Sequence, residues 1–135
     1  MRYMIVVKAS KDSEAGVMPG EELLSAMAGY HEQLAQAGVL VDASGLQPSS
    51  KGWRIKWSDG RKTVVDGPFT ETKELIAGYT IINVKSEEEA REWASRFPNP
   101  HVGDGEIEIR RIFELEDFGD RPEIDRFREL DAGRK

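Results

Sequence analysis

The fold is decided by residues 79 to 90, which read Tyr79-Thr80-Ile81-Ile82-Asn83-Val84-Lys85-Ser86-Glu87-Glu88-Glu89-Ala90. The first six are mostly apolar and rich in β-branched side chains, which predicts a buried strand. Ser86 precedes Glu89 by three residues, the pattern of a capping box, so a helix is expected to begin there. Pro98 ends that helix. A strand therefore leads into a helix in this half of the chain.

The first half of the chain has the same order. Tyr3–Val7 predicts a buried strand, Lys8–Pro19 a loop, and Gly20-Glu21-Glu22 the start of a helix, because acidic residues favour the positive end of the helix dipole. Gly38 is placed to end this helix, and an extended segment follows it. The apolar face of the helix is formed by Leu23, Met27, Tyr30 and Leu34.

The middle of the chain predicts a β-hairpin. Trp53–Trp57 alternates large apolar and basic residues, as a half-exposed strand does, and Asp59-Gly60 supplies a tight turn before Lys62–Val65 returns. A second turn at residues 66–69 precedes about one helical turn over Thr70–Leu75. Glu106–Leu115 is expected to be the last strand.

These elements predict an α+β fold, a ferredoxin-like βαββαβ unit with an inserted β-hairpin. The domain should cover residues 1–115, and residues 116–135 should form a charged, partly helical C-terminal extension. Asp120 is a candidate cap for a short helix with Pro122 in its first turn. That helix would present Ile124, Phe127 and Leu130 on one side and pack on the body or on a partner subunit.

The two central strands predict a homodimer. Tyr3–Val7 and Tyr79–Val84 are apolar at nearly every position, so both faces of the sheet require cover. Two helices cover only one face, and a bare apolar face is unfavourable on a monomer. Packing of sheet against sheet in a two-fold dimer would bury it.

Composition excludes several classes of protein. The 135 residues fit one domain and, at 39% hydrophobic, can build a core. The net charge of −6 argues against nucleic-acid binding, although Trp53 and Trp57 alternate with basic residues as stacking platforms do. No apolar run is long enough to span a membrane, and the strand-like start does not resemble a signal peptide, so a cytoplasmic protein is expected. The absence of Cys and two isolated His residues give no metal site, and no cofactor is implied.

The turn Asp66-Gly67-Pro68-Phe69, followed by Glu71-Thr72-Lys73-Glu74 and Gly78-Tyr79, resembles the DGPF branch of the YCII-related proteins. The likeness covers about residues 1–115. It extends to Met1-Arg2-Tyr3-Met4, Ala37-Gly38-Val39-Leu40, Gly45-Leu46-Gln47-Pro48, Glu92-Trp93-Ala94 and Ile107-Glu108-Ile109-Arg110.

This resemblance implies a dimeric α+β barrel built on a ferredoxin-like unit. Short YCII relatives hold a His–Asp pair in a cleft, which implies acid–base chemistry on a small molecule. Their His does not align clearly with His31. DGPF proteins also resemble partners of extracytoplasmic sigma factors, which implies a regulatory role instead.

Asp66 and His31 are the candidate catalytic residues. A carboxylate held on a tight turn can act as a base, whereas an Asp in this position can also simply accept backbone N–H groups and shape the turn. His31 lies at the edge of the apolar helix face. Imidazole is the usual acid–base group near neutral pH, so His31 is a candidate for proton transfer; the alternative is a solvated histidine without a catalytic role. His101 has less support.

The candidate ligand-binding residues are Tyr30, Phe69, Lys73 and Arg110. Tyr30 can offer its hydroxyl to a ligand or lie in the core. Lys73 follows the turn, either lining a cleft or pairing with Glu71. Arg110 and its neighbour Arg111 alternate faces, and one of them binds an anion or pairs with a nearby Glu.

Two functions remain open from the sequence, beside a third possibility, a structural dimer whose cleft is vestigial. The first is a cytoplasmic homodimer with a small-molecule cleft beside the turn at residues 66–69, using Asp66 for proton transfer with help from His31 or Tyr30. The second is a non-catalytic binding or regulatory module in which Asp66 is architectural. No motif names a substrate.

Overall fold

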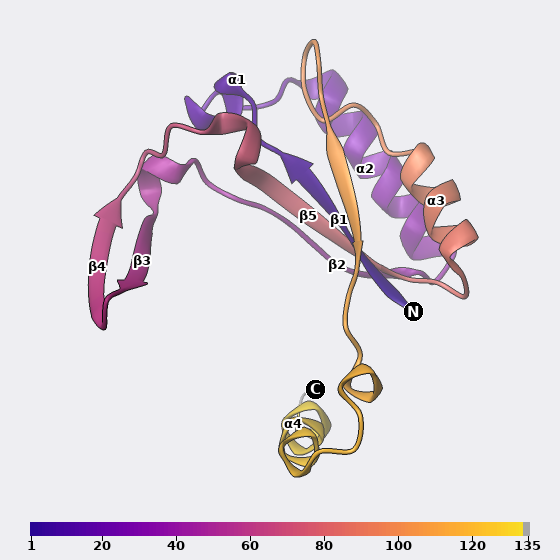
Figure 1. Cartoon of the computed structure of the whole chain (residues 1–135). Coiled ribbons are helices and arrows are strands. Elements are labelled where there is room, and N and C mark those ends of the chain that lie inside the picture. Colours follow the sequence, from indigo (N-terminus) through magenta and orange to yellow (C-terminus); the bar gives the residue numbers. More distant parts are fainter. Residues whose placement is uncertain (134–135) are drawn as a thin grey trace.

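The computed structural model describes residues 1–133 and shows an α+β fold with a four-stranded sheet and a separate two-stranded one (Figure 1). The strands are β1 (Arg2–Lys8), β2 (Leu40–Gly45), β3 (Trp53–Ser58), β4 (Arg61–Asp66), β5 (Ile76–Asn83) and β6 (Ile107–Arg111).

The large sheet has the ferredoxin-like arrangement predicted from the sequence. Its strand order is β2-β5-β1-β6, and every neighbouring pair is antiparallel. Ile5 on β1 lies opposite Thr80 on β5 and Ile109 on β6. The predicted hairpin, β3–β4, is inserted between β2 and β5, and its turn has positive φ at both Asp59 (51°) and Gly60 (74°).

The helices are α1 (Lys11–Glu14), α2 (Glu21–Gln36), α3 (Glu87–Ser95) and α4 (Pro122–Ala132), with short 3-10 turns η1 (Ser49–Lys51), η2 (Thr72–Glu74) and η3 (Leu115–Phe118). Gly38 follows α2 with φ of 73°, as expected of a glycine that ends a helix. Ser86 caps α3 by accepting the Glu89 N–H, as predicted. The predicted capping box does not close, because the Glu89 carboxylate accepts the N–H of Lys85 in place of that of Ser86.

Three further local predictions were wrong. The segment Lys8–Pro19 is not all loop, because Ser10 and Ser13 form a capping box that starts α1. The last strand is Ile107–Arg111, shorter than Glu106–Leu115, because Leu115 turns into η3. Asp120 does not cap α4; the helix starts at Pro122, whose fixed φ suits a first position, after the uncapped Arg121.

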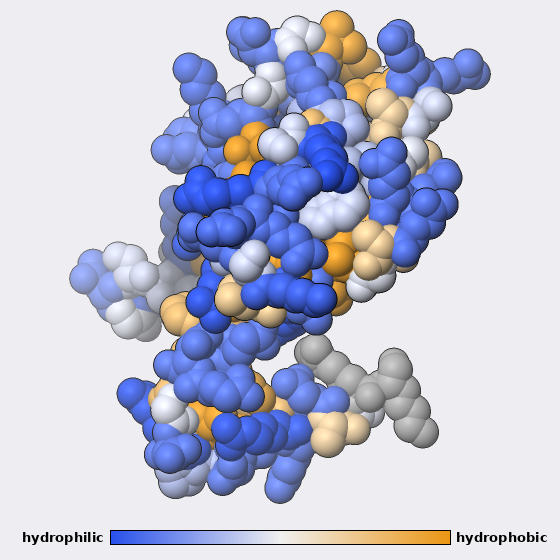
Figure 2. Space-filling view, turned by 90° about the vertical axis from the view of Figure 1, so that its right-hand side faces the viewer, coloured by the Kyte–Doolittle hydropathy of each residue, from blue (hydrophilic) through white to orange (hydrophobic). Residues whose placement is uncertain are grey.

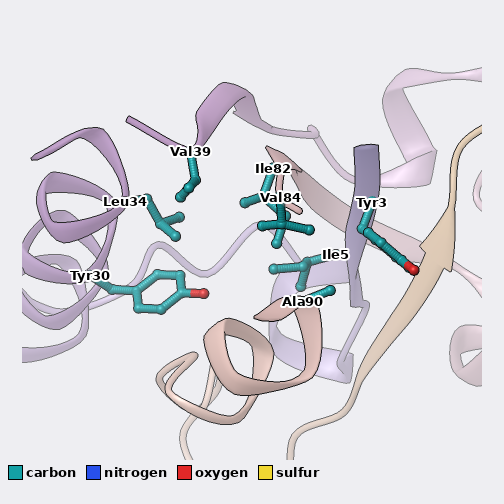
Figure 3. Packing of buried hydrophobic residues seen from close by; sticks show 8 residues of the cluster. All are labelled: Tyr3, Ile5, Tyr30, Leu34, Val39, Ile82, Val84 and Ala90. Carbon is teal, nitrogen blue, oxygen red and sulfur yellow. The ribbon is translucent and has the colours of Figure 1, made fainter. Parts of the chain in front are cut away.

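The core lies between the sheet and helices α2 and α3 (Figure 3). Alternate residues of the central strands point into it, so Tyr3 and Ile5 are buried on β1 and Ile82 on β5. Leu34 of α2 and Ala90 of α3 meet them from the helix layer. The outer surface of that layer is mainly hydrophilic (Figure 2).

The opposite face of the large sheet carries no helix in the part of the chain that the structure describes (Figure 1). Met4, Val6, Tyr79 and Ile81 lie on this face by strand alternation and are half-buried. We call it the uncovered face. Its presence agrees with the two-faced pattern of the central strands, whereas its burial by a second copy remains a prediction.

The C-terminal extension leaves the sheet after β6. Arg2 holds its start, because Nε and Nη2 of Arg2 donate to the two carboxylate oxygens of Glu114 at 2.9 and 3.2 Å. From there η3 and α4 extend beyond the end of the sheet (Figure 1). None of the described helices is long and apolar enough to cross a membrane.

Candidate functional site

The structure divides the six predicted site residues among three places. Asp66, Phe69 and Lys73 lie at the base of the hairpin or just after it, and Arg110 lies on β6. Tyr30 and His31 lie on α2. Because α2 and the hairpin are on opposite sides of the large sheet (Figure 1), a single chain does not bring Asp66 together with His31 or Tyr30.

The backbone of the turn at residues 66–69 packs closely against η1. The Gly67 N–H donates to the Gly52 carbonyl at 3.0 Å. A Cβ added to Gly67 would lie 1.8 Å from the carbonyl oxygen of Ser49, a distance that no side chain can occupy. Glycine is therefore required at position 67 by close backbone approach.

Ser49 joins this turn to α1. Its hydroxyl donates to the Glu14 carboxylate and accepts the N–H of Phe69 at 3.0 Å, while its own N–H donates to Glu14 at 2.9 Å. The guanidinium of Arg54 stacks over the Phe69 ring, 3.7 Å from the centroid. Sequence reasoning missed Glu14, Ser49 and Arg54, which are spread over forty residues of chain.

Asp66 takes no part in this network. It is the last residue of β4 and pairs with Trp53 across the hairpin. Its carboxylate is exposed, and no group within residues 1–133 donates a hydrogen bond to it. The turn thus keeps its shape through backbone contacts and Ser49, while the carboxylate stays available.

His31 is tied into the protein by both ring nitrogens. Nδ1 lies 2.7 Å from the Met27 carbonyl oxygen, which can only accept, so Nδ1 carries a proton. In the neutral ring, Nε2 then accepts from the Thr80 hydroxyl at 2.8 Å, and Thr80 is only 2% exposed. His101 is similarly engaged, with Nε2 2.6 Å from the Lys8 carbonyl oxygen.

Tyr30 is a core residue. Its hydroxyl donates to the Trp93 carbonyl at 2.7 Å, and its ring packs edge-on against Phe97. Burial raises the pKa of Tyr30 to about 12, an increase that the charge of Arg96 partly opposes. A phenol held in this way serves packing and hydrogen bonding within the fold.

The charged candidates lie at the surface. Arg110 is exposed and pairs with Glu108 at 3.2 Å, and Lys8 approaches the same carboxylate at 3.8 Å. Lys73 is exposed on η2, and within the described chain no ion pair joins it to Glu71. Arg111 lines a second, smaller hollow beside Phe113 and Asp117.

A groove of about 460 Å³ lies between α3 and the edge strand β6. Its volume falls within the range of small-molecule sites. Ala90, Ala94 and Ile107 form part of its apolar wall, and Arg91 and Glu87 form an ion pair at 3.4 Å beside it. None of the six predicted site residues lines this groove.

Comparison with known proteins supports the family resemblance. The model of the YCII-related domain matches residues 1–116. An uncharacterized protein of Rhizobium meliloti (strain 1021) is 30% identical over 92 residues, which are 68% of this chain and 74% of that protein.

Among solved structures, 5-chloro-2-hydroxyhydroquinone dehydrochlorinase from Burkholderia phenoliruptrix, in complex with 2,5-dihydroxybenzoquinone, aligns with a TM-score of 0.48 and 15% identity. The alignment covers 89% of this chain and all of that one. On the family match, the chain belongs to the YCII-related family.

Proposed function

We propose that the chain forms a homodimer through the uncovered face and binds a small molecule beside the turn at residues 66–69, with the Asp66 carboxylate as the ligand-facing group. The observation that carries this function is the Asp66 carboxylate, which has no partner within residues 1–133, next to a turn that other residues hold in place. A polar group that is held in position and has no hydrogen-bond partner within the protein can orient a ligand.

The uncovered face suits burial by a second copy. Met4, Val6 and Ile81 supply apolar surface at its centre. The polar groups around them already have partners: the Tyr79 hydroxyl donates to Asp42 at 2.9 Å, and Glu108 pairs with basic neighbours. Packing two such faces together would therefore leave few polar groups unsatisfied.

The chemistry open to Asp66 is that of a carboxylate. It can accept a hydrogen bond from a ligand hydroxyl or amine, or take its proton as a general base. General acid–base catalysis usually requires a second titratable group in the same site, and the single chain does not place His31 or Tyr30 there. That second group would have to come from the ligand or from the partner subunit.

A non-catalytic binding or regulatory module is the second candidate function. One observation favours it: His31 and Tyr30, the groups expected to assist proton transfer, are committed to hydrogen bonds inside the protein. This function requires ligand or partner binding at the turn but no turnover.

A thermal-shift screen with Asp66→Asn tests the proposal. The probe is a fragment library rich in amines and phenols, which donate hydrogen bonds to a carboxylate. Asp59→Asn is the matched control, because it makes the same change at the other end of the hairpin, in a turn position that Asn tolerates. We expect wild type and Asp59→Asn to share ligand-induced increases in melting temperature that Asp66→Asn loses.

The other outcomes are equally informative. If Asp66→Asn keeps the same increases, Asp66 is not the ligand-facing group. If Asp66→Asn melts well below wild type without ligand while Asp59→Asn does not, Asp66 is architectural. A hit that binds without being converted supports the binding module over the enzyme.

A further inference from the structure

The β3–β4 hairpin presents an apolar face with no cover from the described chain. Strand pairing places Trp53, Ile55, Trp57 and Val64 on one side of the hairpin, together with Lys62 opposite Trp57 and Asp66 opposite Trp53. Trp53 and Trp57 are 65% and 69% exposed, although tryptophan is usually well buried. An isolated two-stranded hairpin is marginally stable in water, so this face requires a partner surface.

The C-terminal extension also carries large apolar side chains that the described chain leaves exposed. Ile124 of α4 is buried, but Phe127 and Leu130, three and six residues further along, are 53% and 67% exposed. Phe113, just before η3, is also exposed and contacts Phe118 at a centroid distance of 5.1 Å. These side chains form an apolar surface on η3–α4 that the rest of the chain leaves open.

The two arms lie on the same side of the molecule but apart from each other (Figure 1). Arg2, which holds Glu114 at the start of the extension, points to the uncovered face by strand alternation. The hairpin stands beyond the same face, at the other end of the sheet. A second copy seated on the uncovered face would therefore meet both arms.

The arms carry opposite charge. Residues 51–66 contain five basic and two acidic side chains, whereas residues 114–132 contain eight acidic and three basic ones. Contact between two hairpins, or between two extensions, would join like charges at the interface. Contact of a hairpin with an extension brings together segments of opposite net charge. On the hairpin, Lys62 projects from the same face as Trp57, whereas Arg54, Lys56 and Arg61 project from the other face.

We infer that the two protomers exchange arms, so that Ile55, Trp57 and Val64, toward the tip of the hairpin of each protomer, pack against η3–α4 of the other, while Asp66 at the hairpin base stays open. This inference rests on the homodimer proposed above. A two-fold axis makes each contact twice, so the two arm pairs together bury twice the apolar area of one pair. The opposite net charge of the arms favours this pairing, and the apolar residues of both arms supply the contact.

Crosslinking of the full-length chain tests this pairing. Unlabelled and isotope-labelled protein are mixed, allowed to exchange subunits and treated with a carbodiimide, which joins lysines to carboxylates in direct contact. We expect mass spectrometry to find mixed-isotope peptide pairs that link Lys62, which shares the face of Trp57, to Glu123, Asp125, Glu129 or Asp131. A dimer that gives only same-isotope pairs between these segments, or none, overturns the arm exchange.

Sedimentation distinguishes the absence of a dimer from the absence of arm exchange within a dimer. Sedimentation of the unmodified protein as a monomer refutes both the dimer and the exchange, whereas a dimer without mixed-isotope pairs between the arms refutes the exchange alone.

A variant tests how much the contact between the arms contributes to the stability of the dimer. Phe127→Ser with Leu130→Ser alters exposed side chains only, and Val102→Ser, at a site 91% exposed in the loop before β6, is the matched control. We expect the double variant to raise the dimer dissociation constant about tenfold, and added salt to weaken the wild-type dimer. An unchanged dissociation constant in the double variant overturns the exchange.

Discussion

Gly67→Ala is the sharpest test of how the turn at residues 66–69 is built. The new Cβ would lie 1.8 Å from the Ser49 carbonyl oxygen and 2.7 Å from its carbon. Both atoms belong to the backbone, so no side-chain rotation relieves the clash. The turn has to move away from η1.

The structure gives the size of the effect. Movement of the turn disturbs two hydrogen bonds, Gly67 N–H to Gly52 and Phe69 N–H to Ser49, each worth about 1 kcal/mol. It also disturbs the stacking of Arg54 on Phe69, worth about 1 kcal/mol. Alanine restricts the unfolded chain and returns about 0.5 kcal/mol. We expect a net loss of about 2–3 kcal/mol, which lowers the melting temperature of a chain of this length by roughly 7–10 °C.

The assay is urea unfolding followed by circular dichroism and by tryptophan fluorescence, since Trp53 and Trp57 report on the hairpin. Gly45→Ala is the control, because its Cβ would meet no atom within 4 Å. A Gly67→Ala protein within about 0.5 kcal/mol of wild type by both probes would refute the close approach described for this turn.

Three further predictions concern the hydrogen bonds and ion pair that organise the rest of the fold. Thr80→Val removes the partner of His31 Nε2 inside the protein and should lower the free energy of unfolding by about 1–2 kcal/mol; no loss in urea unfolding would mean that this bond is not formed. Tyr30 has a pKa of about 12 when folded and 10.0 as its ordinary value, so its contribution to stability is complete below pH 10 and falls as the pH rises toward 12. Relative to Tyr30→Phe, wild type should lose up to about 1.4 kcal/mol per pH unit there, and parallel pH profiles would contradict the burial of the phenol. A double-mutant cycle on Arg2 and Glu114 should give a coupling energy of about 0.5–1 kcal/mol that declines with salt, and a coupling near zero would show that this pair does not hold the extension.

Sequence patterns predicted the elements whose signals are local. The Ser86 cap, the Asp59-Gly60 turn and the glycine at position 38 each fix a boundary through neighbouring residues, and the structure has all three. The pairing of two β–α halves followed from the order of these elements. The last strand was predicted too long, because the strand-like alternation of residues continues to Leu115, past the end of β6 at Arg111.

The site was harder to predict because its contacts join distant parts of the chain. The Ser49 hydroxyl meets Glu14, 35 positions away, and His31 meets Thr80, 49 positions away. Periodicity placed His31 at the rim of a helix face but could not show that Thr80 lies opposite. The residue types at positions 66–69 predicted a tight turn; in the structure Asp66 ends β4 just before it, and only the structure shows that Ser49 and backbone contacts hold that turn.

The most direct test is the mass of the particle in solution, because the proposed cover of the uncovered face and the exchanged arms both require two copies. Light scattering coupled to gel filtration, at micromolar concentration, measures it without a ligand or a variant. The account predicts a particle of twice the chain mass of 15.2 kDa. A single stable species of 15.2 kDa would contradict it.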